Sequence, residues 1–283
     1  MFNELKEKIK KDKPFLDLIN IRSVKKMPSY GDLKRRFLSY GVNVRIRDSN
    51  GKFYKLKVSP SIRIAKKYER IINLVPHILP KFYGRDRNYL LSEFLDGRTL
   101  TKDESLDIFF EAGKMCGEIS KYKAEPNKKK EFENINCKII KSLLKKQVIS
   151  SKDYQKILKS YEYLAQKIEY DVVLAPLDIK LSNFMLDSQN KLYFVDEDGI
   201  DYNINGVWLD YLKFDKKQNK AFLKGYHSVS PLRFFNNKEY LRLAIFISSL
   251  HMLDFFLRLG EETTEYFNYE LRHLLKIAKI GKL

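Results

Sequence analysis

Three side chains in the middle of the chain have the types and the spacing of a metal-assisted phosphotransfer site. Asp178 is followed by Asn183 five positions later, and Asp196 ends an apolar run thirteen positions after Asn183. Carboxylate and amide oxygens are ligands that Mg²⁺ accepts, together with the oxygens of a bound phosphate. Asp-x4-Asn alone is a weak signal, since a chain of this size contains it about once by chance. Its meaning therefore depends on the elements around it.

The residues ahead of this loop predict a small antiparallel sheet with one helix. Asn50-Gly51 after an alternating run is a strong hairpin signal. Ser59-Pro60 stops the sheet, and the apolar residues that follow have helical spacing. The expected strands are 33–39, 42–47, 52–58, 81–83 and 89–94, and the expected helix is 62–74.

From Thr101 the pattern is mostly helical, interrupted by a short extended island that contains Asp178. The expected helices are 102–122, 132–148, 151–169 and 238–259, and the expected strands are 171–174, 184–186 and 191–195. A basic linker, Ala124–Lys130, is expected between the first two helices. The predicted fold is α+β, with a sheet lobe over residues 1–95 and a larger, mostly helical lobe over residues 96–283.

The composition is that of a folded protein. Hydrophobic residues make up 44% of the 283 residues, which excludes disorder along the whole chain. Apolar stretches such as Leu243–Leu250 fall short of the roughly 20 residues that cross a bilayer, and no secretion signal begins the chain, so we expect a cytoplasmic protein without a transmembrane helix. Cys116 and Cys137 lack partners at metal-like spacing, so we expect reduced thiols in helices and no structural zinc.

A formal net charge of +18 restricts the partners without choosing one. It permits a nucleic acid, an anionic membrane surface or a phosphorylated substrate. The alternative is compositional, because runs such as Lys128–Lys130 are usually solvated loops.

In its context, the Asp178 loop resembles the catalytic loop of the protein-kinase-like superfamily, in which Asp-x4-Asn precedes a hairpin and a second metal-binding Asp. Lys57 resembles the third-strand lysine of that superfamily, and Glu69 resembles its ion-pair partner on the next helix. Ser92–Leu95 is similar to the inter-lobe hinge, with Gly97 just past it as in aminoglycoside and choline phosphotransferases. The resemblance implies a bilobal fold that binds ATP and Mg²⁺.

The resemblance also implies a role for each matched residue. Asp178 would accept the proton of an acceptor hydroxyl, and Lys180 would neutralise the transferred phosphoryl group. Asn183 and Asp196 would hold Mg²⁺, and Lys57, positioned by Glu69, would bind the α- and β-phosphates. The other implied nucleotide contacts are Tyr40, Gly41, Glu93 and Leu95, and Asp210 matches a buried aspartate that ties down the catalytic loop.

Three positions depart from the superfamily pattern. Pro176 replaces a mainly structural His, and the glycine-rich loop is reduced to Ser39-Tyr40-Gly41. The Asp-Phe-Gly triplet is replaced by Asp196–Gly199, so Asp198 is the alternative metal ligand. We favour Asp196, because the preceding apolar run places it at a strand end.

The candidates also have ordinary interpretations. Lys57 and Glu69 alone would be solvated surface charges, and Asp178 and Asn183 would be a loop cap and a turn residue. A calcium loop of the EF-hand type is excluded by the spacing of its acids. His77, His227, His251 and His273 are scattered and are expected to be ordinary polar residues.

The short segment after the metal site bears on the acceptor. Only 14 positions separate Asp196 from Asp210, whereas protein kinases use about thirty to forty residues there to dock a peptide. We therefore expect a small-molecule, saccharide or glycolipid hydroxyl, as in aminoglycoside phosphotransferases and lipopolysaccharide core kinases. An anionic acceptor fits the charge, with peripheral contact to the inner face of an anionic membrane, and nucleic acid is the less favoured partner.

Two other classes stay open at this stage. A small atypical Ser/Thr protein kinase would share every motif, and autophosphorylation would separate it from a sugar kinase. A catalytically weak pseudokinase acting as a basic interaction module fits the replaced His and the thin glycine loop, whereas the intact Asp178, Asn183 and Asp196 oppose it.

Overall fold

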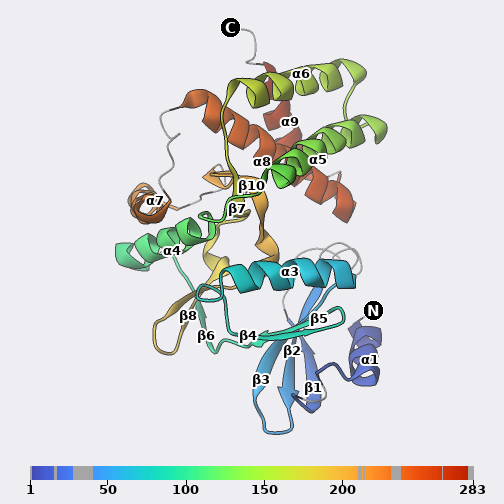
Figure 1. Ribbon diagram of the computed structural model, residues 1–283, viewed down its shortest axis with the longest axis vertical. Coiled ribbons are helices and arrows are strands. Elements are labelled where there is room, and N and C mark those ends of the chain that lie inside the picture. The colour runs from blue at the N-terminus through green and yellow to red at the C-terminus, as the bar shows by residue number, and fades with distance from the viewer. Residues whose placement is uncertain are drawn as a thin grey trace. The chain divides into compact units, whose positions relative to one another are not determined.

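The structure is a computed structural model that describes residues 2–15, 18–27, 41–209, 212, 214–230, 237–262 and 264–279. The chain forms two compact units (Figure 1). Unit 1 comprises Met1–Leu100 and Ser182–Asp198, and unit 2 comprises Thr101–Leu181 and Gly199–Leu283. Unit 1 thus includes a segment that the sequence placed in the helical lobe, because residues 182–198 form a hairpin that pairs with a strand of the first unit.

Unit 1 is built on a five-stranded antiparallel sheet with the order β1-β2-β3-β5-β4. The strands are β1 (Ile21–Lys26), β2 (Val42–Asp48), β3 (Phe53–Val58), β4 (Phe82–Asp86) and β5 (Tyr89–Glu93). Alternation places Val44 and Leu56 on one face, where they share a core with Leu5 and Ile9 of α1 (Phe2–Asp12). Figure 1 shows α1 beside β1.

Two lysines lie on the other face of β3. Lys55 and Lys57 are two residues apart, so both lie on the face opposite to Leu56. Helix α3 (Ile62–Leu74) covers part of this face, and the ring of Tyr68 lies 4.7 Å from the Lys57 Nζ. Ser61 caps the helix by accepting a hydrogen bond from the Ile64 N–H. The cap and the apolar spacing explain why this helix has the predicted bounds.

A second sheet of unit 1 carries the hairpin that follows Asn183. It consists of β6 (Gly97–Thr99), β8 (Phe184–Asp187) and β9 (Leu192–Phe194), in the order β6-β8-β9. The Phe194 N–H donates to the Ile78 carbonyl at 3.0 Å, which ties β9 to the segment after α3. A Cβ on Gly97 would meet the Leu186 carbonyl oxygen at 2.1 Å, so this close pairing requires glycine.

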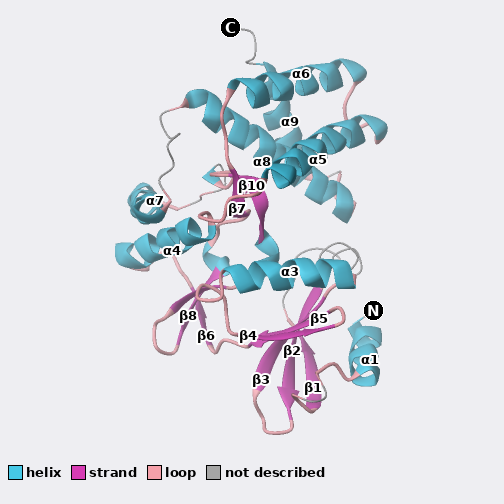
Figure 2. Cartoon of the chain, viewed as in Figure 1, coloured by secondary structure: helices cyan, strands magenta, loops and turns pink. Residues whose placement is uncertain are grey.

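Unit 2 is mostly helical, as Figure 2 shows, and contains one two-stranded sheet. That sheet pairs β7 (Val172–Pro176) with β10 (Ile200–Ile204). The helices are α4 (Leu106–Ile119), α5 (Pro126–Lys145), α6 (Ser151–Lys167), α7 (Lys216–Val229), α8 (Lys238–Leu259) and α9 (Glu265–Lys279). Cys116 in α4 and Cys137 in α5 are free thiols, as predicted.

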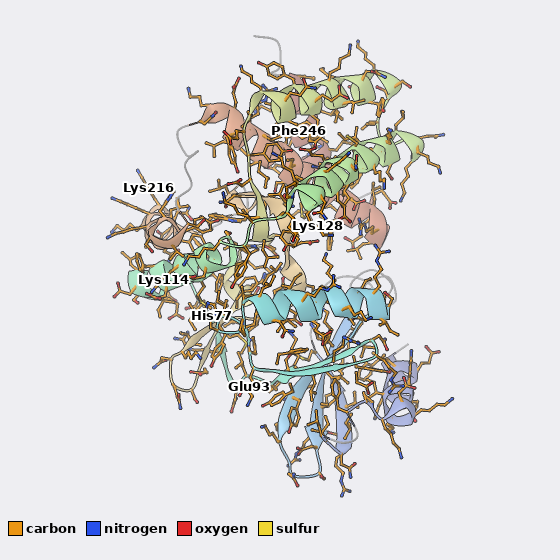
Figure 3. All side chains as sticks on the ribbon, viewed as in Figure 1. His77, Glu93, Lys114, Lys128, Lys216 and Phe246 are labelled. Carbon is orange, nitrogen blue, oxygen red and sulfur yellow. The ribbon has the colours of Figure 1, made fainter. Side chains whose placement is uncertain are left out.

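Helix α8 forms the centre of unit 2. Phe246, labelled in Figure 3, is fully buried and stacks on Tyr161 of α6 with ring centroids 6.0 Å apart. By length and composition, α8 is the one helix of the described residues that could cross a membrane, but 61% of its apolar window is buried. The core helix of a folded protein has the same properties, so α8 is weak evidence for a membrane span.

The sheet lobe and the helical lobe confirm the predicted α+β architecture, and some local details differ from the prediction or are not tested. The sequence missed α1 and β1. The predicted linker Ala124–Lys130 was wrong from Pro126 onward, because Pro126 begins α5 at a position where a missing N–H costs no helical hydrogen bond. The predicted strand 33–39 lies outside the described residues.

Candidate active site

Three consecutive acids of unit 1, Asp196, Glu197 and Asp198, form the centre of the candidate site; we call them the acid triplet. Asn183 Nδ2 donates to Asp196 Oδ2 at 3.2 Å. Glu197 Oε2 lies 2.6 Å from Lys55 Nζ, and Asp198 Oδ1 lies 2.7 Å from Lys57 Nζ. Each acid of the triplet therefore has a different partner.

The hairpin holds Asn183 against Asp196 by main-chain and side-chain contacts. Asn183 ends a short 3-10 helix (Leu181–Asn183) and is buried. Its carbonyl accepts a hydrogen bond from the Val195 N–H at 2.9 Å, and its amide nitrogen donates to Asp196. The pair predicted to bind metal is thus brought together, thirteen positions apart in sequence.

The electrostatics of the triplet suit a cation. Burial, together with the neighbouring Asp198 and Glu197, raises the pKa of Asp196 to about 7, although Lys57 and Lys55 oppose the shift. The described residues contain no group of three or more His, Cys, Asp or Glu side chains arranged to hold a metal ion. A divalent ion at Asn183 and Asp196 would need additional oxygens, which is how Mg²⁺ binds with nucleotide phosphates. The donor set therefore fits Mg²⁺ that arrives with a nucleotide.

Lys57 lies where the sequence predicted it, on the third strand of the hairpin series, and its side chain is 2% exposed. Its Nζ contacts the Asp198 carboxylate and the Tyr68 ring, and makes no well-aligned hydrogen bond among the described residues. A buried ammonium with donors to spare can bind a phosphate.

The predicted ion pair between Lys57 and Glu69 is not formed. Glu69 instead accepts a hydrogen bond from Arg85 Nε at 2.6 Å, at a half-exposed position. Successive helical residues point about 100° apart, so a helix that presents Tyr68 to Lys57 turns Glu69 away. In this structure, Tyr68 and Asp198 flank the Lys57 ammonium.

Asp178 and Lys180 belong to unit 2, at the end of β7. Ile179 between them is fully buried, which anchors the loop and leaves both charged side chains about half exposed. Their side chains form an ion pair. The Leu177 N–H donates to the Gly199 carbonyl at 2.6 Å, so the pairing of β7 with β10 continues to the residue before Asp178.

The other residues singled out from the sequence are Tyr40, Gly41, Glu93, Leu95 and Asp210. Tyr40 and Asp210 lie outside the described residues. Gly41 has φ +91°, and a Cβ there would meet the Val58 carbonyl oxygen at 2.5 Å, so the backbone itself requires glycine.

Glu93 is the last residue of β5 (Figure 3), and Leu95 follows it in a half-buried segment. The Glu93 N–H donates to the Lys81 carbonyl at 2.8 Å, one residue beyond the Phe82–Ser92 pair that ends the β4–β5 pairing. This N–H is therefore engaged within the sheet, and the predicted contact of Glu93 and Leu95 with the nucleotide stays a prediction.

Sequence reasoning missed Lys55 and Glu197. Lys55 Nζ donates to the Glu197 carboxylate at 2.6 Å and to the Val195 carbonyl at 3.2 Å, on both sides of Asp196. The signal available was the period of two that places Lys55 on the face of Lys57.

Comparisons with known proteins were made by family, by sequence and by structure. No family model and no curated protein matches the chain. Among solved structures, choline kinase LicA from Streptococcus pneumoniae has a TM-score of 0.68 at 18% identity, covering 97% of this chain and 99% of that one. The ethanolamine kinase of Plasmodium vivax has a TM-score of 0.65 at 16% identity, with 93% of this chain and 84% of that chain covered. The chain has a protein-kinase-like fold.

A third neighbour is a spectinomycin phosphotransferase. Spectinomycin phosphotransferase APH(9)-Ia, in complex with ADP and spectinomycin, has a TM-score of 0.60 at 14% identity and covers 98% of this chain and 97% of its own. The likeness extends over almost the whole length of each chain. It confirms the fold predicted from the motifs and from the sheet and helix patterns.

Proposed function

We propose that the protein is an ATP- and Mg²⁺-dependent phosphotransferase that moves the γ-phosphoryl group to a hydroxyl of a small-molecule acceptor. The observation that carries the proposal is the Asn183–Asp196 contact at 3.2 Å next to the buried Lys57–Asp198 ion pair. An oxygen pair for Mg²⁺ and a cation for phosphate are the parts that phosphoryl transfer requires. The kinase-like fold supports the same interpretation.

On this proposal the residues have separate tasks. Asn183 and Asp196 bind Mg²⁺, and Lys57 binds the α- and β-phosphates. When bound, Mg²⁺ would neutralise charge on the phosphate oxygens. Asp178 accepts the proton of the acceptor hydroxyl, and Lys180, now paired with Asp178, turns to the transferred phosphoryl group.

A small acceptor is favoured over a peptide. The 14-position separation of Asp196 and Asp210 leaves too little chain for a peptide-docking segment. The structural neighbours carry names for choline, ethanolamine and spectinomycin, all small molecules. A saccharide or glycolipid with anionic groups is the narrower proposal within this class, and its support is the net charge of +18.

The test is acceptor-dependent release of ADP. The protein is incubated with Mg²⁺-ATP and a panel containing amino alcohols, aminoglycosides, free sugars and anionic glycolipids. We expect release above the no-acceptor rate for at least one small-molecule class, and none with Asn183→Ala. Phosphate incorporated only into the protein itself would instead indicate a protein kinase, and absence of Mg²⁺-nucleotide binding would contradict the proposal.

A further inference from the structure

Lys55 contacts the chain on both sides of Asp196. Its Nζ donates to the carbonyl of Val195, the residue before Asp196, and to the carboxylate of Glu197, the residue after it. These contacts join positions about 140 residues apart in sequence, so they fix the segment 195–197 to strand β3. The side chain between the two anchored residues is the one that meets Asn183.

The anchor itself is rigid. Lys55 is in the middle of β3, where its backbone is paired with Arg45 of β2 on one side and with Ser92 of β5 on the other. A side chain that rises from a strand paired on both edges is a fixed support for a functional group. The side chains on the opposite face of β3, Tyr54 and Leu56, pack in the core.

The ion pair is almost dry. The side chains of Lys55 and Glu197 are 11% and 8% exposed. The adjoining cavity measures about 10 Å³, room for about one water, and is lined by the pair itself and by Ile72, Leu79, Pro80 and Ser92. Burial alone would lower the pKa of Lys55, but the attraction of Glu197 and their hydrogen bond raise it above its usual value. The ion pair is thus held at 2.6 Å with little screening by solvent.

The three acids of the triplet differ in the charge of their partners. Glu197 and Asp198 each contact a lysine, whereas the side-chain bond given to Asp196 comes from the neutral amide of Asn183. We propose that the Lys55–Glu197 pair is a positioning device: it keeps the Asp196 carboxylate turned toward Asn183 and so selects Asp196 as the metal ligand. This inference rests on the proposed function.

The test uses charge to separate positioning from simple electrostatics. Lys55→Met removes a cation near the metal site, so electrostatics alone would tighten Mg²⁺ binding, whereas loss of positioning would weaken it. The double variant Lys55→Met with Glu197→Leu removes one charge of each sign, so the net charge is kept and no buried charge is left unpaired. Mg²⁺ half-saturation is measured by calorimetry with ATP on each folded variant.

We expect the double variant to need roughly tenfold more Mg²⁺ for half-saturation, the range seen when outer partners of metal ligands are removed. The ATP affinity of the double variant without Mg²⁺ should change less than twofold. The single variant Lys55→Arg, which can donate to the same two groups, should keep the Mg²⁺ half-saturation of the wild type. Tyr54→Phe is the matched control. It removes a bond to Asp48 on the other face of β3, so it should affect stability alone.

A second readout needs no ligand. The Val195 N–H, bonded to the Asn183 carbonyl, should exchange with solvent faster in the double variant than in the wild type and Tyr54→Phe. Wild-type Mg²⁺ half-saturation in the double variant, tighter binding in Lys55→Met, or unchanged Val195 exchange would overturn the positioning role. Failure of the wild type to bind Mg²⁺-ATP would overturn the proposed function, and Val195 exchange would then still decide whether Lys55 holds the segment.

Discussion

At the scale of residues, the acid triplet distributes three carboxylates among three different partners. Asp198 lies against Lys57 and Glu197 against Lys55, so two of the three negative charges are offset by lysine. Asp196 accepts a hydrogen bond from the Asn183 amide, and burial and the neighbouring acids raise its pKa. This arrangement supports the sequence-based preference for Asp196 over Asp198 as metal ligand, which stays a prediction.

Alanine variants of the two aspartates test that preference. Asp196→Ala should abolish Mg²⁺-dependent ATP binding, because it removes the carboxylate that accepts a hydrogen bond from the Asn183 amide. Asp198→Ala should be milder, since it removes the ion-pair partner of Lys57 and keeps the Asn183–Asp196 contact. Calorimetry with Mg²⁺-ATP on both variants decides between them, and a larger loss in Asp198→Ala would reverse the assignment.

The pH dependence of Mg²⁺ binding follows from the same carboxylate. Because burial and the adjacent acids raise the pKa of Asp196 to about 7, the free protein holds a proton there below that pH. Mg²⁺ must displace this proton, so Mg²⁺ affinity in the ATP complex should rise between about pH 6 and about pH 8 and then level off. Titrations across this range check the prediction, with ATP binding in the absence of Mg²⁺ as control; a flat profile would contradict it.

At the scale of elements, a buried histidine joins α5, α8 and β10 of unit 2. His251 Nε2 lies 2.7 Å from Asn136 Oδ1, and its Nδ1 lies 3.1 Å from Asn203 Nδ2. A neutral ring can donate to the first and accept from the second, whereas a protonated ring would have no acceptor for Nδ1–H at Asn203. The pairing thus requires neutral His251.

Acid should therefore weaken unit 2. Burial lowers the pKa of His251 to about 4 from an ordinary value near 6.5. The unfolded chain takes up a proton first, so this contribution is complete above about pH 6.5 and is lost as the pH falls toward 4, by about 3 kcal/mol in all. Unfolding free energies of the wild type and His251→Gln should converge over this range. Parallel pH curves for the two proteins would refute this linkage.

Elements with local signals were predicted well. The break at Ser59-Pro60 and the apolar spacing predicted the bounds of 62–74, and the long apolar pattern predicted those of 238–259. Pro126 was interpreted as part of a linker although it is also a favoured first residue of a helix. The Lys55–Glu197 pair could not be predicted, because its members are 142 positions apart and no local pattern joins them. Likewise, sequence order indicated Glu69 as the partner of Lys57, but the rotation of α3 pairs it with Arg85.

At the scale of the whole molecule, the chain crosses between the units on either side of the hairpin. It passes from unit 2 to unit 1 after Leu181 and returns after Asp198. Asp178 and the proposed metal ligands Asn183 and Asp196 are close in sequence yet belong to different units. The proposed tasks are divided accordingly: unit 1 supplies Lys57, Asn183 and Asp196, and unit 2 supplies the group that acts on the acceptor.

The net charge of +18 gives a prediction about the acceptor. If the charge serves an anionic glycolipid, the protein should bind anionic vesicles at low salt and release them as salt approaches physiological strength, where charges more than about 8 Å apart are screened. Co-sedimentation with anionic vesicles measures this, with neutral vesicles as control. Equal binding to both, or binding to neither, would leave a soluble small-molecule hydroxyl as the acceptor.

The central claim is phosphoryl transfer from ATP, and the most direct measurement compares the wild type with Asp178→Ala in the same assay. With Mg²⁺-ATP and an acceptor identified from the panel, mass spectrometry quantifies the phosphorylated acceptor and calorimetry quantifies nucleotide binding. The account predicts that Asp178→Ala loses about 10²- to 10⁴-fold in transfer rate and keeps its nucleotide affinity, because Asp178 acts on the hydroxyl and not on ATP. A transfer rate within tenfold of the wild type would contradict it.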